Sequence, residues 1–145
     1  MFKRILLPTD GSAASEEAVR KCMQFASETG AHVIGYHVMP EFHVFTYQTE
    51  MLEDTRDQFR KDSAEHAQKF LAVIENAAKA SGVSCEVAFT PNDHPYEAII
   101  EAAREYKCDL IAMASHGRKG IRGMLMGSET QKVLTHSQLP VLVYR

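Results

Sequence analysis

The chain begins with Met1-Phe2-Lys3-Arg4-Ile5-Leu6-Leu7-Pro8-Thr9-Asp10-Gly11-Ser12, in which a short apolar run ends in a polar turn that contains a glycine. The run is aliphatic and stops at a proline, as a buried strand does. After the turn, apolar residues recur at steps of three and four up to Gly30, and they are Ala18, Val19, Cys22, Met23 and Ala26. This spacing is typical of one face of a helix. The opening therefore predicts a strand over residues 2–8 and a helix from about Ser12 to Thr29.

The same alternation of apolar runs and amphipathic stretches continues to the end of the chain. Further strands are predicted over residues 33–38, 83–89, 108–114 and 139–144, and further helices over 51–81, about 95–106 and 128–136. Strands that alternate with helices are typical of an open, parallel sheet with right-handed crossovers and helices on both faces. The length of 145 residues is that of one domain of about 150 residues, so we predict a single α/β domain over residues 1–145.

Composition argues against several classes of protein. The 16 Lys and Arg residues against 19 Asp and Glu give a net charge of −3, without the basic excess of a nucleic-acid-binding surface. The apolar runs are far shorter than the ~20 residues that a membrane helix needs, and the N-terminus lacks the features of a signal peptide. The three cysteines, Cys22, Cys85 and Cys108, are widely spaced and odd in number, which favours packed thiols in a reduced cytoplasm over disulfides or a zinc site.

Two loops follow predicted strands at the carboxyl edge, where open α/β sheets bind ligands. In the first, Asp10 places a carboxylate just after the opening strand, where it could bind a ribose hydroxyl or a metal ion. The alternative is that Asp10 or Ser12 only caps the following helix. Sequence alone leaves both interpretations open.

The second loop covers residues 115–128 and contains four glycines, Gly117, Gly120, Gly123 and Gly127. Glycines allow several backbone N–H groups to point inward, and the positive end of the helix that starts near Ser128 adds to them, so the segment predicts a phosphate site. The hydroxyl of Ser128 has a second use, because Ser128 and Gln131 match a capping box. The basic side chains between the glycines either screen phosphate charge or face solvent.

Other sites for chemistry are not indicated. The glycine spacing fits neither the P-loop nor the dinucleotide fingerprint, and the Gly-x-Ser-x-Gly elbow of hydrolases does not occur. His32, His37 and His43 lie close in sequence, but their spacing matches no metal site. We interpret His116, beside the glycine-rich segment, as a loop residue. The sequence thus indicates a binding site without an evident catalytic group.

The whole pattern resembles the universal stress proteins of the UspA family, almost over the full length. The resemblance rests on the opening run from Ile5 to Ser12, on Tyr36-His37-Val38, on Met113-Ala114-Ser115-His116-Gly117, on Gly127-Ser128 and on Pro140-Val141-Leu142-Val143. It implies a flavodoxin-like or Rossmann-like five-stranded sheet of strand order 3-2-1-4-5 and a homodimer formed through the last strand, residues 141–144. It also implies that the chain falls into either a nucleotide-binding or a non-binding branch.

The binding branch carries Gly-x2-Gly-x9-Gly-Ser/Thr, which falls here on Ala114, Gly117, Gly127 and Ser128, so alanine replaces the first glycine. An alanine costs little there if its φ angle is negative. By the same resemblance, Asp10 would hold the ribose or a divalent cation, and the backbone of Val38 would pair with the adenine edge. The base and sugar pocket would be lined by Pro8, Thr9 and Met113. The phosphates would be held by Gly117, Gly127, Ser128 and Thr130.

The resemblance therefore implies a cytoplasmic stress-response or signalling module that binds ATP or AMP, with Mg²⁺ as a further candidate cofactor. It implies neither nucleic acid nor membrane as a partner. Two alternatives from other classes remain. One is a nucleotide-free dimerising scaffold, which the alanine at position 114 motivates. The other is a slow Mg²⁺-dependent ATPase or phosphotransferase that uses Asp10 and Ser128.

Overall fold

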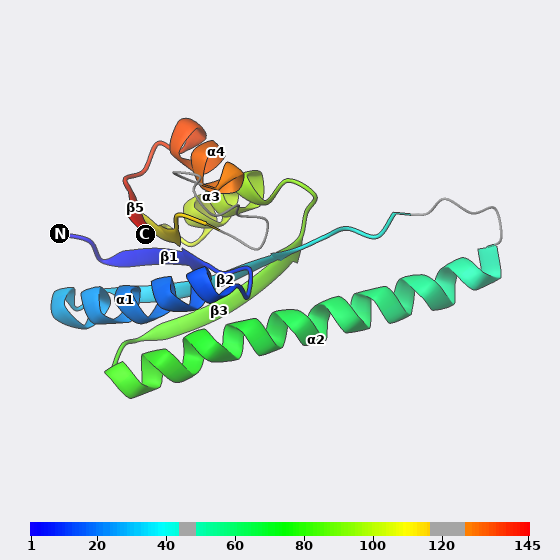
Figure 1. Cartoon of the computed structure of the whole chain (residues 1–145), viewed down its shortest axis with the longest axis horizontal. Coiled ribbons are helices and arrows are strands. Elements are labelled where there is room, and N and C mark those ends of the chain that lie inside the picture. The colour runs from blue at the N-terminus through cyan, green and yellow to red at the C-terminus, as the bar shows by residue number, and fades with distance from the viewer. Residues whose placement is uncertain (44–48, 117–126) are drawn as a thin grey trace.

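The structure is a computed structural model that describes residues 1–43, 49–116 and 127–145, with the backbone alone for residues 49–54. Strands and helices alternate along the chain as the sequence predicts (Figure 1). The strands are β1 (Arg4–Pro8), β2 (His32–Met39), β3 (Cys85–Pro91), β4 (Leu110–Ala114) and β5 (Val141–Tyr144). The helices are α1 (Ala13–Thr29), α2 (Thr49–Ser81), α3 (Pro95–Glu105) and α4 (Ser128–His136).

The five strands form one sheet of order β3-β2-β1-β4-β5, in which every neighbouring pair is parallel. The predicted fold class and strand order are therefore confirmed. β1 lies in the centre and pairs with β2 on one side and with β4 on the other. Figure 1 shows α1 and α2 on one face of the sheet and α3 and α4 on the other.

Each face of the sheet carries its own apolar core, because successive side chains of a strand point to opposite faces. Ile5 and Leu7 of β1 pack with α1 and α2, whereas Leu6 between them packs with α3 and α4. All three side chains are fully buried. Burial on both faces explains why this strand is a continuous aliphatic run without polar alternation.

Among the described side chains of the long helix α2, those that are buried lie in its C-terminal half. Its buried side chains are Ala67, Leu71, Ile74 and Ala78. The N-terminal half extends beyond the sheet, and it follows a segment that leaves the end of β2 (Figure 1). There the ring of Phe42 lies 5.4 Å from that of Phe59, with the guanidinium of Arg56 6.0 Å from the Phe42 ring centre. Among the described residues no helix, α2 included, is both long and apolar enough to cross a bilayer.

Four predicted strands begin too early. The first begins at Arg4 instead of residue 2, and in the other three the first predicted residues close the preceding helix or turn. Gly82, with φ of +67°, ends α2 and its amide donates to Lys79, while the amide of Val83 donates back to Ala78. These are the two bonds of a Schellman cap, so β3 begins at Cys85 instead of residue 83. Lys107, with φ of 54°, ends α3 in a related way, which moves the start of β4 from residue 108 to 110. β5 starts at 141 instead of 139 because the Leu139 backbone bonds to the Ser137 hydroxyl.

Candidate functional site

The direction of winding reverses between β1 and β4. From β1 the chain proceeds outward to β2 and β3, and it then returns to the other side of β1 to form β4 and β5. Ile5 pairs with Leu110 and Leu6 with Ile111, so the two strands run in the same direction side by side. Neighbouring strands lie about 5 Å apart. The turns that follow Pro8 and Ala114 therefore leave the same edge of the sheet at its topological switch point, where ligands bind in this class of fold.

The turn after β1 is fixed by hydrogen bonds to β2. The Thr9 amide donates to the Tyr36 carbonyl at 2.8 Å, and the Thr9 carbonyl lies 2.7 Å from Nδ1 of His37. His37 is itself buried. Because a carbonyl only accepts, His37 must carry its proton on Nδ1. Hydrogen bonds from both the amide and the carbonyl of Thr9 to β2 thus fix the backbone just before Asp10.

Hydrogen bonds at the start of α1 show different positions for the side chains of Asp10 and Ser12. Ser12 is the N-cap of α1 and its hydroxyl accepts from the Ser15 amide at 3.1 Å. Oδ1 of Asp10 accepts from the Ser12 amide at 3.0 Å and from the Ser15 hydroxyl at 2.7 Å. Ser12 therefore caps the helix, while Asp10 is oriented by the same polar cluster at the carboxyl edge of β1.

Val38 lies on the next strand, past the point where β1 ends. The pairing of β1 with β2 stops at Pro8 and Tyr36. Backbone groups of even-numbered residues of β2 face β1, as the bonds from His32 to Lys3 and from Thr9 to Tyr36 indicate. The N–H and C=O of Val38 therefore face the same side, beside the turn that carries Asp10.

The end of β4 is bonded directly to the start of α4. The hydroxyl of Thr130 is buried and donates to the Ala114 carbonyl at 2.8 Å. The amide of Gly127 donates to the carbonyl of Ser115. Met113 and Ala114 are each 7% exposed. These two hydrogen bonds hold the N-terminus of α4 at the carboxyl edge of β4.

The N-cap of α4 is Gly127, with no side-chain cap, so the capping box predicted at Ser128 is wrong. Ser128 is instead the first helical residue and its side chain is exposed. The Gln131 amide donates to Gly127, which is the first bond within the helix. The amides of Ser128, Glu129 and Thr130 precede that bond and have no acceptor inside the helix. Gly117 and the basic side chains of the second loop lie outside the described residues.

A match to the universal stress protein family covers residues 1–145 of the chain. The chain belongs to this family. A universal stress protein from Thermus aquaticus is 31% identical over 148 residues, which span 100% of both chains. The solved structure of MJ0577, a universal stress protein of Methanocaldococcus jannaschii, superposes with a TM-score of 0.83 at 29% identity over 99% of this chain and 95% of that one. A universal stress protein solved in complex with cAMP has a TM-score of 0.72 at 24% identity over 99% of this chain and 97% of that one, which shows the shared fold.

The sequence pattern does not predict several contacts at the carboxyl edge of the sheet. The ring of Phe70, on α2, makes an edge-to-face contact with His37 at 5.1 Å. A carboxylate oxygen of Glu129 accepts from the Tyr96 amide at 3.0 Å, so its charge lies at the start of α3. Tyr96 is the second residue of α3, and a carboxylate is favourable beside those amides. A local sequence signal for these contacts between distant elements does not exist.

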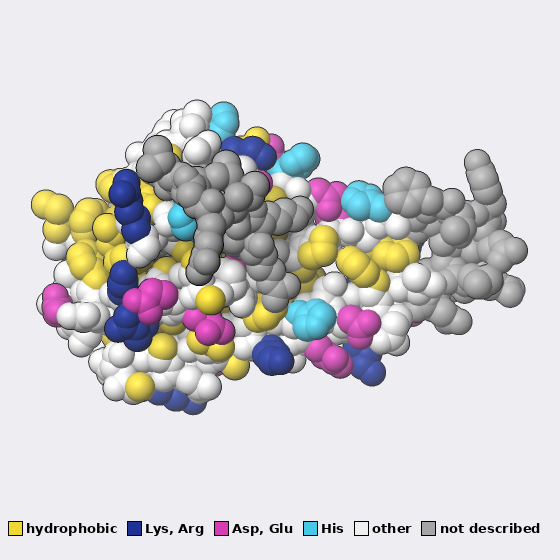
Figure 2. Space-filling model, in the orientation of Figure 1, with side chains coloured by type: hydrophobic (Ala, Val, Ile, Leu, Met, Phe, Trp, Pro, Cys, Tyr) yellow, Lys and Arg dark blue, Asp and Glu magenta, His cyan; other side chains and the backbone are white. Residues whose placement is uncertain are grey.

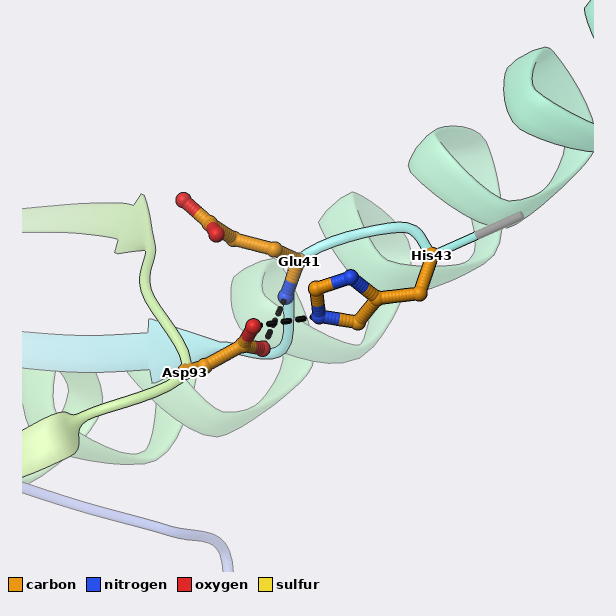
Figure 3. Close-up of side chains that lie close together, drawn as sticks. All are labelled: Glu41, His43 and Asp93. Atoms are coloured by element: carbon orange, nitrogen blue, oxygen red, sulfur yellow. Dashed lines mark hydrogen bonds and ion pairs between the residues drawn. The ribbon is translucent and has the colours of Figure 1, made fainter. Parts of the chain in front are cut away.

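A second group of polar side chains meets at the carboxyl ends of β2 and β3. Glu41, His43 and Asp93 each offer one ligand atom, and these atoms lie within 4.8 Å of one another. Oδ1 of Asp93 accepts from the Glu41 amide at 3.1 Å, and Oδ2 is bonded to Nε2 of His43 (Figure 3). The Glu41 amide, together with His43, lowers the pKa of Asp93. The spacing of the histidines does not reveal this cluster, because Asp93 lies 50 residues from His43 in the sequence.

The three cysteines are packed thiols, as predicted. Cys22 and Cys108 are buried and Cys85 is partly buried, and all three are free. Burial raises the pKa of Cys22 to about 12 and that of Cys108 to about 11, and it also raises the pKa of Cys85. Because a thiol reacts as its thiolate, these groups are poor nucleophiles at neutral pH.

Proposed function

We propose that this protein binds an adenine nucleotide, ATP or AMP, at the carboxyl edge between β1 and β4 and serves as a stress-response or signalling module. The observation that carries the proposal is the bonding of β4 to α4. Thr130 and Gly127 hold the start of a nine-residue helix against Ala114 and Ser115, at the end of the strand that pairs with β1. A fixed helix N-terminus beside a switch point favours an anionic ligand.

The phosphate contacts would come from backbone amides. The amides of Ser128, Glu129 and Thr130 have no acceptor within α4, and the exposed Ser128 hydroxyl could add a further donor. Thr130 would contribute its amide only, because its hydroxyl proton already bonds to Ala114. The carboxylate of Glu129 bonds to the Tyr96 amide and to Lys132, which offsets part of its negative charge. Gly117 would complete the loop, as the family motif implies.

The nucleoside would lie towards β2. The backbone of Val38 faces the turn of Asp10, where its N–H and C=O suit the edge of an adenine. Pro8, Thr9 and Met113 would line the base and sugar. The Asp10 carboxylate would receive a ribose hydroxyl or a divalent cation such as Mg²⁺. In support, a family member of the same fold has been solved in complex with cAMP, an adenine nucleotide.

The test is calorimetric titration of the purified protein with ATP, AMP and adenosine, with Gly127→Val as the diagnostic variant. The φ of Gly127 is −68°, so valine is not excluded by the backbone. Its side chain would instead obstruct the amides of α4, and we expect at least tenfold weaker ATP binding with adenosine binding little changed. Gln138→Val is a matched control because Gln138 is exposed beyond the other end of α4. Equal ATP affinity of wild type and Gly127→Val would contradict the phosphate placement, and no binding of any ligand at millimolar concentration would favour the nucleotide-free scaffold.

We also propose a cytoplasmic homodimer that pairs through β5. This strand is an edge of the sheet, and its four residues, Val141 to Tyr144, are all partly exposed. Exposed apolar edges favour pairing with another chain. The Ser115 amide donates to Tyr144 and the Ile111 amide to Pro140, so the even-numbered residues face β4 and the N–H of Val143 points outward.

The substitution Val143→Pro tests this dimer directly. Proline removes the outward N–H but no bond to β4, so the fold should survive while the intermolecular ladder loses a donor. We expect sedimentation to show a dimer for the wild type and a monomer for the variant at micromolar concentration. An unchanged dimer in Val143→Pro, with unchanged circular dichroism, would place the interface elsewhere.

A further inference from the structure

Glu41, His43 and Asp93 are brought together by the pairing of β2 with β3. These strands stay in register to their last residues, Met39 and Pro91. The Asn92 amide continues the ladder by donating to the Met39 carbonyl at 2.9 Å. The segments that leave the two strands therefore start side by side, with Glu41 and His43 on one and Asp93 on the other (Figure 3). In the space-filling view, histidine and acidic side chains adjoin at the surface where the chain leads out to α2 (Figure 2).

The charge around this cluster differs from that around a similar pair at the opposite edge of the sheet. There, Nε2 of His32 lies 3.2 Å from Glu86, and the guanidinium of Arg4 lies 3.3 Å from the same carboxylate oxygen. The arginine already supplies a cation to Glu86. At Glu41 and Asp93, by contrast, no lysine or arginine among residues 1–43, 49–116 and 127–145 forms an ion pair with either carboxylate.

We propose that Glu41, His43 and Asp93 bind a divalent transition-metal ion of the Zn²⁺ type. The site offers one imidazole nitrogen and two carboxylate oxygens, with all ligand atoms within 4.8 Å of one another. Three such ligands and a water complete the four-coordinate shell of zinc, with metal–ligand distances of about 2.0–2.2 Å. The nitrogen ligand favours Zn²⁺ over Mg²⁺ and Ca²⁺, which prefer oxygen.

Binding requires only small changes in the cluster. Nε2 of His43 is bonded to Asp93 in the free protein. In that bond Nε2 carries the proton of the neutral ring and donates it to the carboxylate. The ion takes the place of this proton on Nε2, and the ring takes up its one proton on Nδ1 by exchange with solvent. The carboxylate of Glu41 can close on the ion by rotation about its own side-chain bonds. A bound ion would tie the segment that leads to α2 to the turn before α3. This site is separate from the proposed nucleotide site and does not depend on it.

The experiment is calorimetric titration of the full chain, without an affinity tag, with ZnCl₂ in a buffer that does not chelate zinc. We expect one saturable site per chain. His43→Ala and Asp93→Asn should weaken it at least tenfold, and Glu41→Gln at least threefold. All three residues are exposed, so the variants should fold, which circular dichroism checks. His32→Ala is the matched control, since it removes a histidine bonded to a carboxylate outside the cluster.

A further control, Cys85→Ala, tests whether a cysteine binds the zinc. Cys85 is only partly buried, whereas the other two cysteines are buried, and its removal should leave zinc binding unchanged. A second readout is the ¹⁵N resonance of the histidine rings, where Zn²⁺ should shift the signal that disappears in His43→Ala. The proposal is overturned if the wild type shows no saturable binding. It is equally overturned if any of the three ligand variants binds as the wild type does, or if His32→Ala or Cys85→Ala loses as much affinity as His43→Ala.

Discussion

The contact of Gly11 with Phe70 predicts a large cost for a small substitution. Gly11 has φ of +77°, and a Cβ atom built on it would lie 2.4 Å from Cε1 of Phe70. The ring contacts those of His37, at 5.1 Å, and His66, at 6.3 Å between ring centres, so moving it aside would disturb these contacts. Gly11→Ala therefore combines backbone strain with a steric clash at the turn of Asp10.

The magnitude follows from these two contributions. A non-glycine residue in the left-handed region costs about 1–2 kcal/mol, and forcing an extra carbon into a packed site costs about 1–3 kcal/mol. We expect Gly11→Ala to lower the free energy of unfolding by about 2–5 kcal/mol. Gly30 and Gly82 are matched controls, with φ of +72° and +67° and nothing within 4 Å of a built Cβ. Alanine at either control should cost only the backbone strain of about 1–2 kcal/mol.

Urea unfolding at equilibrium measures these differences, and a double-mutant cycle with Phe70→Ala isolates the clash. In the Phe70→Ala background, Gly11→Ala should cost no more than Gly30→Ala does in the wild type. The coupling between the two substitutions should then be about 1–3 kcal/mol. If Gly11→Ala costs the same as Gly30→Ala, or if its cost is unchanged without the ring, the packing argument is refuted.

Further predictions concern single interactions. Thr130→Val should cost about 1–3 kcal/mol in urea unfolding, because it leaves the Ala114 carbonyl without its hydroxyl donor, whereas Thr135→Val, which removes an exposed bond to Gln131, should cost less. Partial desolvation of Asp109 raises its pKa, but hydrogen bonds from the Lys3 and Arg4 amides lower it overall. The ionised carboxylate therefore stabilises the folded protein above the unfolded pKa of about 3.9, and this stabilisation is lost as the pH falls. Asp109→Asn should flatten the fall in the free energy of unfolding below pH 4. Iodoacetamide at pH 8 should modify Cys22 only after unfolding, because burial raises its thiol pKa to about 12; rapid modification of the folded protein would contradict its burial.

The element order could be predicted because it depends on local patterns, whereas the strand order came only from the resemblance to the family. The aliphatic run of β1 and the helical spacing between Ala18 and Ala26 are set by burial on the two faces of one sheet. The ends of the elements were less predictable, since capping depends on backbone geometry. Lys107 adopts a positive φ at the end of α3 without being a glycine, and a valine that looks like strand, Val83, completes the cap of α2.

The site was predictable only in part for the same reason. Asp10 and Gly127 lie in loops that the sequence marks by composition, and the pairing of β1 with β4 places the strands that precede these loops side by side. The supporting contacts join residues that are far apart in the chain, such as His37 with Thr9 and Thr130 with Ala114. The cluster of Asp93 with Glu41 depends likewise on the register of β2 with β3. Such contacts are consequences of the fold and carry no local signal of their own.

The alanine at position 114 is the sequence feature that favours a scaffold without nucleotide. Its backbone conformation weakens that argument, because the position does not require a glycine for its φ angle. Among the described residues, Lys107 is the only non-glycine residue with positive φ, so Ala114 has the negative φ of an ordinary strand residue. It pairs with Tyr144 of β5, and its carbonyl accepts from Thr130. A glycine is needed where φ is positive or where a methyl group would clash, and the first condition does not apply here. If the methyl group crowded the ligand instead, Ala114→Gly should raise ATP affinity at least tenfold in the titration described above, whereas an affinity within threefold of the wild type would show that the alanine is tolerated.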